Sequence, residues 1–456
     1  MIAELKPYPE YRESALPWLG KVPEHWKQRR TKFLFKERIQ KGFPDEPLLA
    51  ATQSKGVVRK DEYGSRTVTA TKDLHLLKLV EQGDYVISLR SFEGGIEVAH
   101  SRGIISPAYT VLAPQKEASQ GYYTYFFKSP DFIRSLTLFV TGIREGQNID
   151  YERLSRAYLP LPPSDEQAAI VRFLGWANGQ LEKAIRAKRK VITLLNEQKQ
   201  VIIHRAVTRG LDPSVPLKPS GVPWLGDIPK HWEVRPIKTL LRETDRRSLD
   251  GADTLLSLTR NRGLIPHSEM TEKMHSANTL VGYKQYKPGQ IVMNRMQAWS
   301  GMFGSGAVFG LVSPDYAVFD ILGGHDVKFV LARHKAKDLV GQFAIASKGI
   351  GSGFNRLYTD RFGPIRITIP PIDEQYSIVA YIDRETNGLN SAISRFEREI
   401  ELLREYRTRL VADVVTGKLD VREAAAKLPD ETMSDLSDND SVEALEDEPF
   451  EEEALV

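Results

Sequence analysis

The 456-residue sequence contains no cysteine and no long hydrophobic run. A chain without cysteine fits a reducing compartment, where disulfides are rare. No apolar run approaches the roughly 18 residues that a membrane-spanning helix needs, and the first residues lack the charged-then-apolar pattern of a secretory leader. These absences predict a soluble cytoplasmic protein.

The signatures of several enzyme classes are missing as well. The sequence has no Gly-x-x-x-x-Gly-Lys-[Ser/Thr] motif, so ATP-driven translocation is not encoded here. The nine histidines, His100, His204 and His267 among them, show no metal-ligand spacing. Two Ser-Pro-x-Tyr words, at Ser106 and Ser313, are superficially similar to the Asn/Asp-Pro-Pro-Tyr site of amino-methyltransferases. They lack the second proline, and no glycine-rich cofactor turn precedes them. We therefore assign no catalytic residue, metal or cofactor to this chain.

Charge is segregated along the sequence. Residues 430–456 hold 12 Asp or Glu and no Lys or Arg. Taking those 12 from the 60 acidic residues leaves 48 against 63 basic ones, a formal charge of +15 on residues 1–429. A basic body favours a polyanionic partner. The acidic segment is too charged and too poor in bulky side chains to fold alone, and we expect a solvated, disordered end.

The chain repeats itself at a spacing of about 207 residues. "PWLGKVPEHW" at residues 17–26 returns as "PWLGDIPKHW" at residues 223–232, an offset of 206. "LPLPPSDEQAAIV" at 159–171 matches "ITIPPIDEQYSIV" at 367–379, an offset of 208. Three further matches lie in the same order with similar offsets. The sequence therefore contains a duplicated module of roughly two hundred residues.

Each copy divides into a strand-rich front and a helical back. Short apolar runs such as residues 84–89 and 290–293, bounded by Gly and Pro, predict strands. The helical backs begin after Pro-Pro pairs at 162–163 and 370–371, and the Asp-Glu-Gln that follows puts acids at the positive end of the helix. The alternative, a catalytic acid pair, is disfavoured because no nucleophile or metal-ligand cluster accompanies it.

We therefore predict a mixed α/β (α+β) fold with two front domains, each followed by a long helix. The expected divisions are a first front domain at 1–163, a first helix at 164–210, a second front domain at 211–371, a second helix at 372–421, and an acidic tail at 422–456.

Both helical segments carry the a/d spacing of a coiled coil, with apolar residues at alternating steps of four and three. The second seam has the same spacing as the first, at an offset of 208 residues. The apolar seam residues are Leu181, Ile185, Ile192, Leu195, Ile202, Leu389, Ile393, Phe396, Ile400, Leu403 and Leu410. Lys199 and Arg407 interrupt the two seams at the same place, which costs stability and can fix register or orientation.

Each helix could pack on its own domain, but two matching seams in one chain favour pairing with each other. Parallel and antiparallel pairing are both permitted by the length of the connection, and the antiparallel form gives an approximate two-fold axis. About thirty helical residues rise roughly 45 Å, somewhat over one turn of B-DNA.

These features together resemble the specificity subunits of type I restriction-modification systems. The resemblance rests on the duplicated front domain followed by a helix, on the W-L-G-x-[IV]-P-x-H-W openings at 18–26 and 224–232, and on the P-L-P-P-x-x-E-Q-x-x-I helix entry at 160–170. It covers nearly the whole chain except the acidic tail.

The resemblance implies that each front domain is a target-recognition domain for one half of a split, asymmetric DNA sequence. It implies that the helices form an antiparallel spacer and help to dock two methyltransferase subunits. Restriction/translocase subunits would join the full complex. S-adenosylmethionine, ATP and Mg would then belong to the partner subunits, and this chain would be non-catalytic.

Residues that could touch DNA are polar or basic side chains on glycine-punctuated loops, because groove readout needs donors and acceptors on projecting segments. For any one of them, an ordinary surface position is the alternative. The candidates are Thr52, Gln53, Lys55, Arg90, Ser91, Arg144, Gln147, Asn148, Thr259, Arg260, Arg262, Asn294, Arg295, Gln297, Ser352, Asn355 and Arg356.

Two other functions stay open at this level: an enzyme that modifies DNA by itself, which the missing motifs disfavour, and a non-enzymatic scaffold with two protein-binding ends. Basic charge is the only direct sign of DNA in the residues themselves.

Overall fold

The computed structural model describes residues 5–14, 16, 18–53, 55–62, 73–89, 91–141, 148–270, 279–349 and 355–429. The chain forms two compact units, one of residues Met1–Lys188 with Arg398–Val456 and one of residues Arg189–Glu397. Each unit combines one front domain with part of both long helices. Within the described ranges, no helix is long and apolar enough to cross a membrane.

Among the described residues, the front domain of the first unit is built on a four-stranded antiparallel sheet with five smaller strand pairs around it. The sheet has the order β4 (Phe35–Arg38), β11 (Thr110–Pro114), β8 (Tyr85–Ile87) and β9 (Glu97–Val98). The pairs are β1 (Tyr11–Glu13) with β2 (Lys21–Pro23), β3 (Lys27–Arg30) with β14 (Tyr158–Leu161), β5 (Leu49–Thr52) with β6 (Gly56–Arg59), β7 (Lys78–Val80) with β10 (Gly103–Ile105), and β12 (Val140–Thr141) with β13 (Asn148–Ile149). The short helices are α1 (Thr31–Leu34), α2 (Ser91–Gly94), α3 (Gln120–Phe127), α4 (Pro130–Leu136), α5 (Tyr151–Arg156) and α11 (Arg422–Ala426).

The second unit repeats this plan. Its sheet has the order β18 (Leu241–Thr244), β25 (Tyr316–Ile321), β22 (Ile291–Asn294) and β23 (Phe303–Gly304). The pairs are β15 (Leu217–Pro219) with β16 (Asp227–Pro229), β17 (Glu233–Pro236) with β28 (Arg366–Ile369), β19 (Leu256–Thr259) with β20 (Gly263–Pro266), β21 (Lys284–Tyr286) with β24 (Gly310–Val312), and β26 (Lys348–Gly349) with β27 (Asn355–Arg356). The short helices are α7 (Val327–His334), α8 (Lys337–Ala346) and α9 (Thr359–Phe362). The duplication seen in the sequence therefore extends to the order of the strands.

Alternation along the strands explains how the second sheet is covered. Ile291 and Met293 of β22 face a core that includes residues of α7 and α8, whereas Val292 between them faces a smaller core with β19 and β24. This two-residue period is what a strand buried on both faces requires. In the first unit, Val86 of β8 likewise joins a different core from its neighbour Tyr85. The mixed α/β class with two domains is confirmed.

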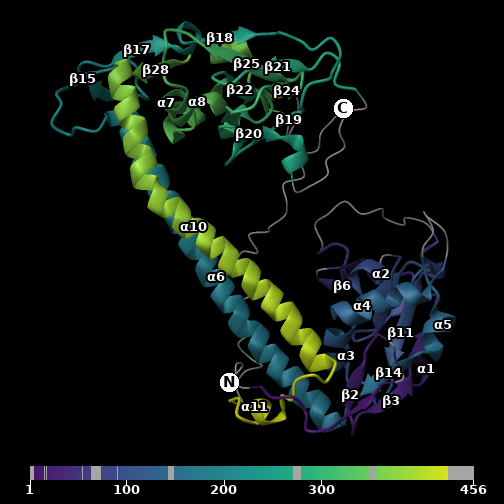
Figure 1. Ribbon diagram of the computed structural model, residues 1–456. Helices are drawn as coiled ribbons and strands as arrows, with labels where there is room; N and C mark the ends of the chain where they lie inside the picture. The colour runs from purple at the N-terminus through teal and green to yellow at the C-terminus, as the bar shows by residue number, and fades with distance from the viewer. Residues whose placement is uncertain are drawn as a thin grey trace. The chain divides into compact units, whose positions relative to one another are not determined.

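The two long helices are α6 (Ser164–Arg209) and α10 (Ile372–Val415), and they run side by side (Figure 1). In the first unit, the Nζ of Lys188 lies 2.5 Å from the Oε2 of Glu399, while Arg407 reaches Glu182 with an N–O distance of 3.2 Å. Residue numbers that rise along one helix fall along the other, so the helices are antiparallel, and the predicted antiparallel coiled coil is confirmed.

The apolar seam residues are withdrawn from solvent along both helices. Leu181, Ile185, Ile393, Ile400 and Leu410 are buried, and the other six are half-buried. By contrast, Leu194 and Leu402, which immediately precede the seam residues Leu195 and Leu403, are about half exposed. The heptad spacing therefore identifies the face that each helix presents to the other.

Glu166, in the first turn of α6, ties that helix to the front domain of the first unit. Its side chain is 1% exposed and accepts hydrogen bonds from Trp26 Nε1 at 2.8 Å and from the hydroxyl of Tyr8. The Nε2 of His25 lies 2.7 Å from its other oxygen. Burial, and then the hydrogen bond to Glu166, raises the pKa of the Tyr8 hydroxyl far above its usual value.

The second unit has the same arrangement at Glu374 of α10. Trp232 Nε1 donates to Glu374 at 3.1 Å, and His231 Nε2 lies 2.7 Å from the same carboxylate. We call this Trp–His–Glu contact the clasp. The clasp explains why the His-Trp and Asp-Glu-Gln motifs recur together. It also gives the repeated glutamate a structural role at the start of each long helix.

Candidate nucleic-acid interface

The turn between β5 and β6 carries three of the predicted DNA-contacting residues. Thr52 is buried, and its hydroxyl donates to the carbonyl oxygen of Gly56 at 2.9 Å and accepts from the backbone N–H of Lys55 at 3.0 Å. Gly56 has φ of +72°, which suits glycine, and an added Cβ would lie 2.7 Å from the carbonyl oxygen of Val98. Thr52 therefore shapes the turn, while Gln53 and Lys55 stand exposed on it.

The turn between β19 and β20 is built in the same way. The hydroxyl of Thr259 donates to the carbonyl oxygen of Gly263 at 2.9 Å and accepts from the backbone N–H of Arg262 at 3.1 Å. The guanidinium of Arg262 lies 2.5 Å from Glu269 and is more than half exposed. A surface ion pair of this kind is weak enough to open for another anion.

A lysine braces each turn against the domain behind it. Lys128 Nζ donates to the carbonyl oxygens of Gln53, at 3.1 Å, and Gly94, at 2.9 Å. Lys335, 207 residues on, donates to the carbonyl oxygen of Arg260 at 3.2 Å. The backbone positions of Gln53 and Arg260 are therefore held, while both side chains are exposed.

Lys128 also pairs with a buried acid in the first unit. Glu97 is 2% exposed, and burial raises its pKa to about 7 against the opposing effect of Lys128. This acid belongs to β9, directly behind the turn.

A second pair of turns follows β8 and β22. In the first unit, the hydroxyl of Ser91 accepts from the backbone N–H of Ser88 at 2.8 Å, and Ser91 is 1% exposed. In the second unit, the Oδ1 of Asn294 accepts from the backbone N–H of Met296 at 3.0 Å. Ser91 and Asn294 are both buried, so they shape their turns, whereas Gln297 is half-buried.

These turns lie next to the hairpin turns in each unit. The side chain of Gln53 packs against Gly94 at the end of α2 in the first unit. In the second, the guanidinium of Arg260 donates to the carbonyl oxygen of Ser300 at 2.9 Å and to its hydroxyl at 3.0 Å. Trp299, beside Ser300, is 42% exposed and was not among the predicted residues. The signal in the sequence was a tryptophan shortly after the apolar run at 290–293.

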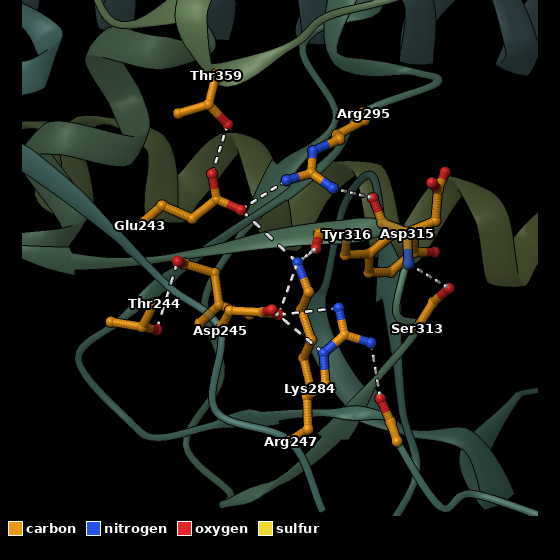
Figure 2. Close-up of polar contacts among 12 residues, drawn as sticks. Glu243, Thr244, Asp245, Arg247, Lys284, Arg295, Ser313, Asp315, Tyr316 and Thr359 are labelled. Atoms are coloured by element: carbon orange, nitrogen blue, oxygen red, sulfur yellow. Dashed lines mark hydrogen bonds and ion pairs between the residues drawn. The ribbon is translucent and has the colours of Figure 1, made fainter.

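Arg295 and Arg356 are held by acids rather than projecting freely, and Figure 2 shows the contacts of Arg295. The guanidinium of Arg295 donates to Glu243 at 2.6 Å and is one-fifth exposed. Arg356 donates to both oxygens of Asp315, at 2.7 and 2.8 Å. Thr359 donates from its hydroxyl to the other oxygen of Glu243, at 2.5 Å. This network holds the segment around Arg356 against the sheet.

Lys284 lies inside the same network and was not predicted from the sequence. It is 2% exposed, its Nζ lies 3.6 Å from Glu243 and 3.5 Å from Asp245, and it donates to the carbonyl oxygen of Tyr316 at 2.8 Å. In the first unit, Lys78 makes the matching contacts with Glu37 at 3.7 Å and the carbonyl oxygen of Tyr109 at 2.8 Å. The signal available in the sequence was a lysine inside a strand in both copies.

The remaining predicted residues are less fully described. Asn355 is exposed in β27. Asn148 lies in β13, but its side chain is outside the description, and Arg90, Arg144, Gln147 and Ser352 lie outside the described residues. In the described ranges, no group of three or more His, Asp or Glu could hold a metal ion.

Comparison with known proteins gives a consistent set of relatives. No protein-family model matches the chain. The chain is 30% identical over 114 residues to the type I restriction enzyme EcoKI specificity subunit of Escherichia coli strain K12, covering 25% of this chain and 23% of that protein. It is 24% identical over 242 residues to a putative type I restriction enzyme MjaX specificity subunit of Methanocaldococcus jannaschii, covering 47% and 52%.

A solved chain from work on complex assembly and conformational transition of the type I R-M system has the same fold. It matches with a TM-score of 0.58 and 14% identity, over 87% of this chain and 99% of that one. The matches span about a quarter and about half of the two curated relatives. The resemblance to type I specificity subunits drawn from the sequence is confirmed.

Proposed function

We propose that the chain is the DNA sequence-specificity subunit of a type I restriction-modification complex. Its two front domains, residues 1–163 and 211–371, would each read one half of a bipartite, asymmetric target. The observation that carries the proposal is the duplication of one domain, down to strand order and turn chemistry, in a chain whose curated relatives are specificity subunits. Two similar readers with different side chains suit two different half-sites.

In this proposal, the turns between β5 and β6 and between β19 and β20 contact the DNA bases. Lys55 and Arg262 occupy equivalent exposed places and would neutralise phosphates or reach base edges. Arg260 would do the same, and the neutral Gln53 would hydrogen-bond to base edges or phosphates. The other predicted DNA-contacting residues keep that role in the proposal, except for the buried Thr52, Ser91 and Asn294, which would shape their turns. Arg295 and Arg356, with acid partners in place, would act mainly by positioning their segment.

The paired helices would set the length of the unspecified gap and dock two methyltransferase subunits, with restriction/translocase subunits in the full complex. This chain would then be non-catalytic, and S-adenosylmethionine, ATP and Mg would be bound by the partners. The antiparallel seam with its repeated polar contacts supports a helix pair of defined register.

The test is a domain replacement. Residues 1–163 are exchanged for the front domain of another specificity subunit, and the methylated motif is read by methylome sequencing in a host that also makes the methyltransferase. We expect one half of the motif to change and the other to stay. A change in both halves at once would refute separate readers.

A salt titration separates a DNA reader from a two-ended protein scaffold. Affinity for duplex DNA that falls linearly with the logarithm of salt, together with sequence preference, is the expected result. Weak binding that does not respond to salt would favour the scaffold.

A further inference from the structure

A cleft of about 670 Å³ opens on the first unit beside the start of α6. Its walls come from β1, β3, β14 and the Pro-Pro entry to the helix. Arg12, Lys27 and Arg29 line it together with His25, and Glu117 is the one acid among its lining residues. Lys27 and Arg29 are two positions apart on β3, so their side chains share one side of the strand.

Only part of the positive charge in this cleft is neutralised by the residues around it: His25 is paired with Glu166, 2.7 Å away. The guanidinium of Arg12 donates to the carbonyl oxygens of Glu24, at 3.1 Å, and of Trp26, which carry no net charge. In the described part of the chain, no carboxylate pairs with the exposed Lys27. Arg29 shares its charge with Glu117 at 3.6 Å. The first turn of α6 brings the positive end of a long helix to the cleft, together with Asp165 and Glu166.

The equivalent cleft of the second unit lacks this charge. It measures about 240 Å³, Glu233 takes the place of Lys27 at an offset of 206 residues, and His325 also lines it. Glu233 lies 2.6 Å from Arg235, so acid and base cancel within the cleft. The cationic cleft is therefore particular to the first copy and is not a requirement of the repeated fold.

The described chain leaves the same unit close to this cleft. The carbonyl oxygen of Leu428 accepts a hydrogen bond from Arg172 at 2.6 Å. Arg172 lies five residues along α6 from Gln167, which lines the cleft, a rise of about 7.5 Å. The acidic segment 430–456, with its 12 carboxylates and no cation, follows directly. Fully extended, 27 residues span up to about 90 Å, so chain length does not limit contact.

We propose that the cleft beside Lys27 is a binding site for an acidic peptide, and that its occupant is the chain's own segment 430–456. The segment then screens these cations from other polyanions. The proposal does not depend on the DNA-reading function, because it concerns a contact within one chain.

The absence of cysteine makes the test direct, since Ser441→Cys places a single thiol in the acidic segment for a fluorescent label. Lys27→Glu copies the residue that the second unit already has at this place, so the fold should tolerate it, and thermal melting checks this. Lys230→Glu is the matched control, because Lys230 is also exposed but lies in the second unit.

The measurement is label anisotropy in the full-length protein. We expect Lys27→Glu to lower it toward the value that the unmodified chain reaches at about 0.5 M NaCl, where charge attraction is screened. Lys230→Glu should leave it unchanged. Equal effects of the two reversals, or no effect of either, would overturn the proposal. So would a Lys27→Glu variant that binds duplex DNA more weakly while the anisotropy stays the same, because DNA would then be the occupant.

Discussion

The Nζ of Lys199 donates a hydrogen bond of 2.7 Å to the Oδ1 of Asn390 on the opposite long helix. Arg407 and Glu182, each 208 residues away from its counterpart, make the equivalent contact at 3.2 Å. A polar contact in an apolar seam is satisfied only when the two helices are in one register. These pairs therefore define how α6 and α10 align.

Replacing both members of one pair with leucine should strengthen the seam. We expect Lys199→Leu with Asn390→Leu to raise the free energy of unfolding by about 1 kcal/mol, because apolar packing replaces a half-exposed polar contact. Urea unfolding followed by circular dichroism measures this, and Gln200→Leu at an exposed position of α6 is the control. A loss of stability in the double variant would show that the polar contact is worth more than the packing.

The clasp predicts unequal losses at two equivalent acids. Glu166 is 1% exposed and has three partners, whereas Glu374 is 24% exposed. We expect Glu166→Gln to cost about 2 kcal/mol and Glu374→Gln about half as much, because an amide turns one acceptor oxygen into a donor. Urea unfolding followed by tryptophan fluorescence reports both. Equal losses would mean that burial does not govern the strength of the clasp.

Glu97 gives the first unit a specific pH dependence. Burial raises its pKa to about 7 from an ordinary value of 4.5. Between these values the folded state holds a proton that the unfolded state has lost, so stability should fall as pH rises from 4.5 to 7. The loss is at most about 3 kcal/mol, and Glu97→Gln should remove this slope. Urea unfolding from pH 5 to 8 measures it, and an unchanged slope in the variant would contradict the assignment.

Lys55→Ala and Arg262→Ala should each weaken DNA binding. A side chain that reads a base should cost about 1 to 3 kcal/mol and relax discrimination at one position. A side chain that holds a phosphate should weaken all sequences equally and make the salt slope shallower by about one. Titrations against matched and mismatched duplexes distinguish the two. No change in either quantity would remove that residue from the interface.

Lengthening both helices tests whether they set the gap in the DNA target. Four residues inserted between Leu195 and Lys199, with a matched insertion between Leu403 and Arg407, add about 6 Å of helix. At about 3.4 Å per base pair, we expect the gap to grow by one or two base pairs while the half-sites stay the same. The insertion locally unwinds the pair, so thermal melting must first show a folded variant. An active, folded variant with the original gap would exclude the helices as the spacer.

Local pattern predicted the helices well. The Pro-Pro pairs and the acids after them mark the starts of α6 and α10 within two residues, because a helix start depends on neighbours in sequence. The residues of the seam were predicted from the period of about 3.5 residues between apolar positions, which the paired helices keep. The run at 84–89 likewise contains β8, Tyr85–Ile87.

Contacts between distant residues could not be predicted in the same way. Nothing near Lys284 in the sequence indicates that it is buried, because its partners Glu243 and Asp245 lie about forty residues earlier. The clasp joins Trp26 to an acid 140 residues later. A single sequence carries periodicity but no record of which distant residues meet, so the role of each acid became clear only from the fold.

The first unit is formed from two separate segments of the chain, and this affects how the protein folds during synthesis. Residues 398–421 pack into it, and the hydroxyl of Tyr122 donates to the carbonyl oxygen of Val415 at 2.8 Å. The second unit, by contrast, is one continuous stretch from 189 to 397. During translation at about 5–20 residues per second, residues 398–421 are made roughly tens of seconds after the first front domain, so the first unit can be completed only after the second. The domain that leaves the ribosome first is therefore the one that finishes folding last.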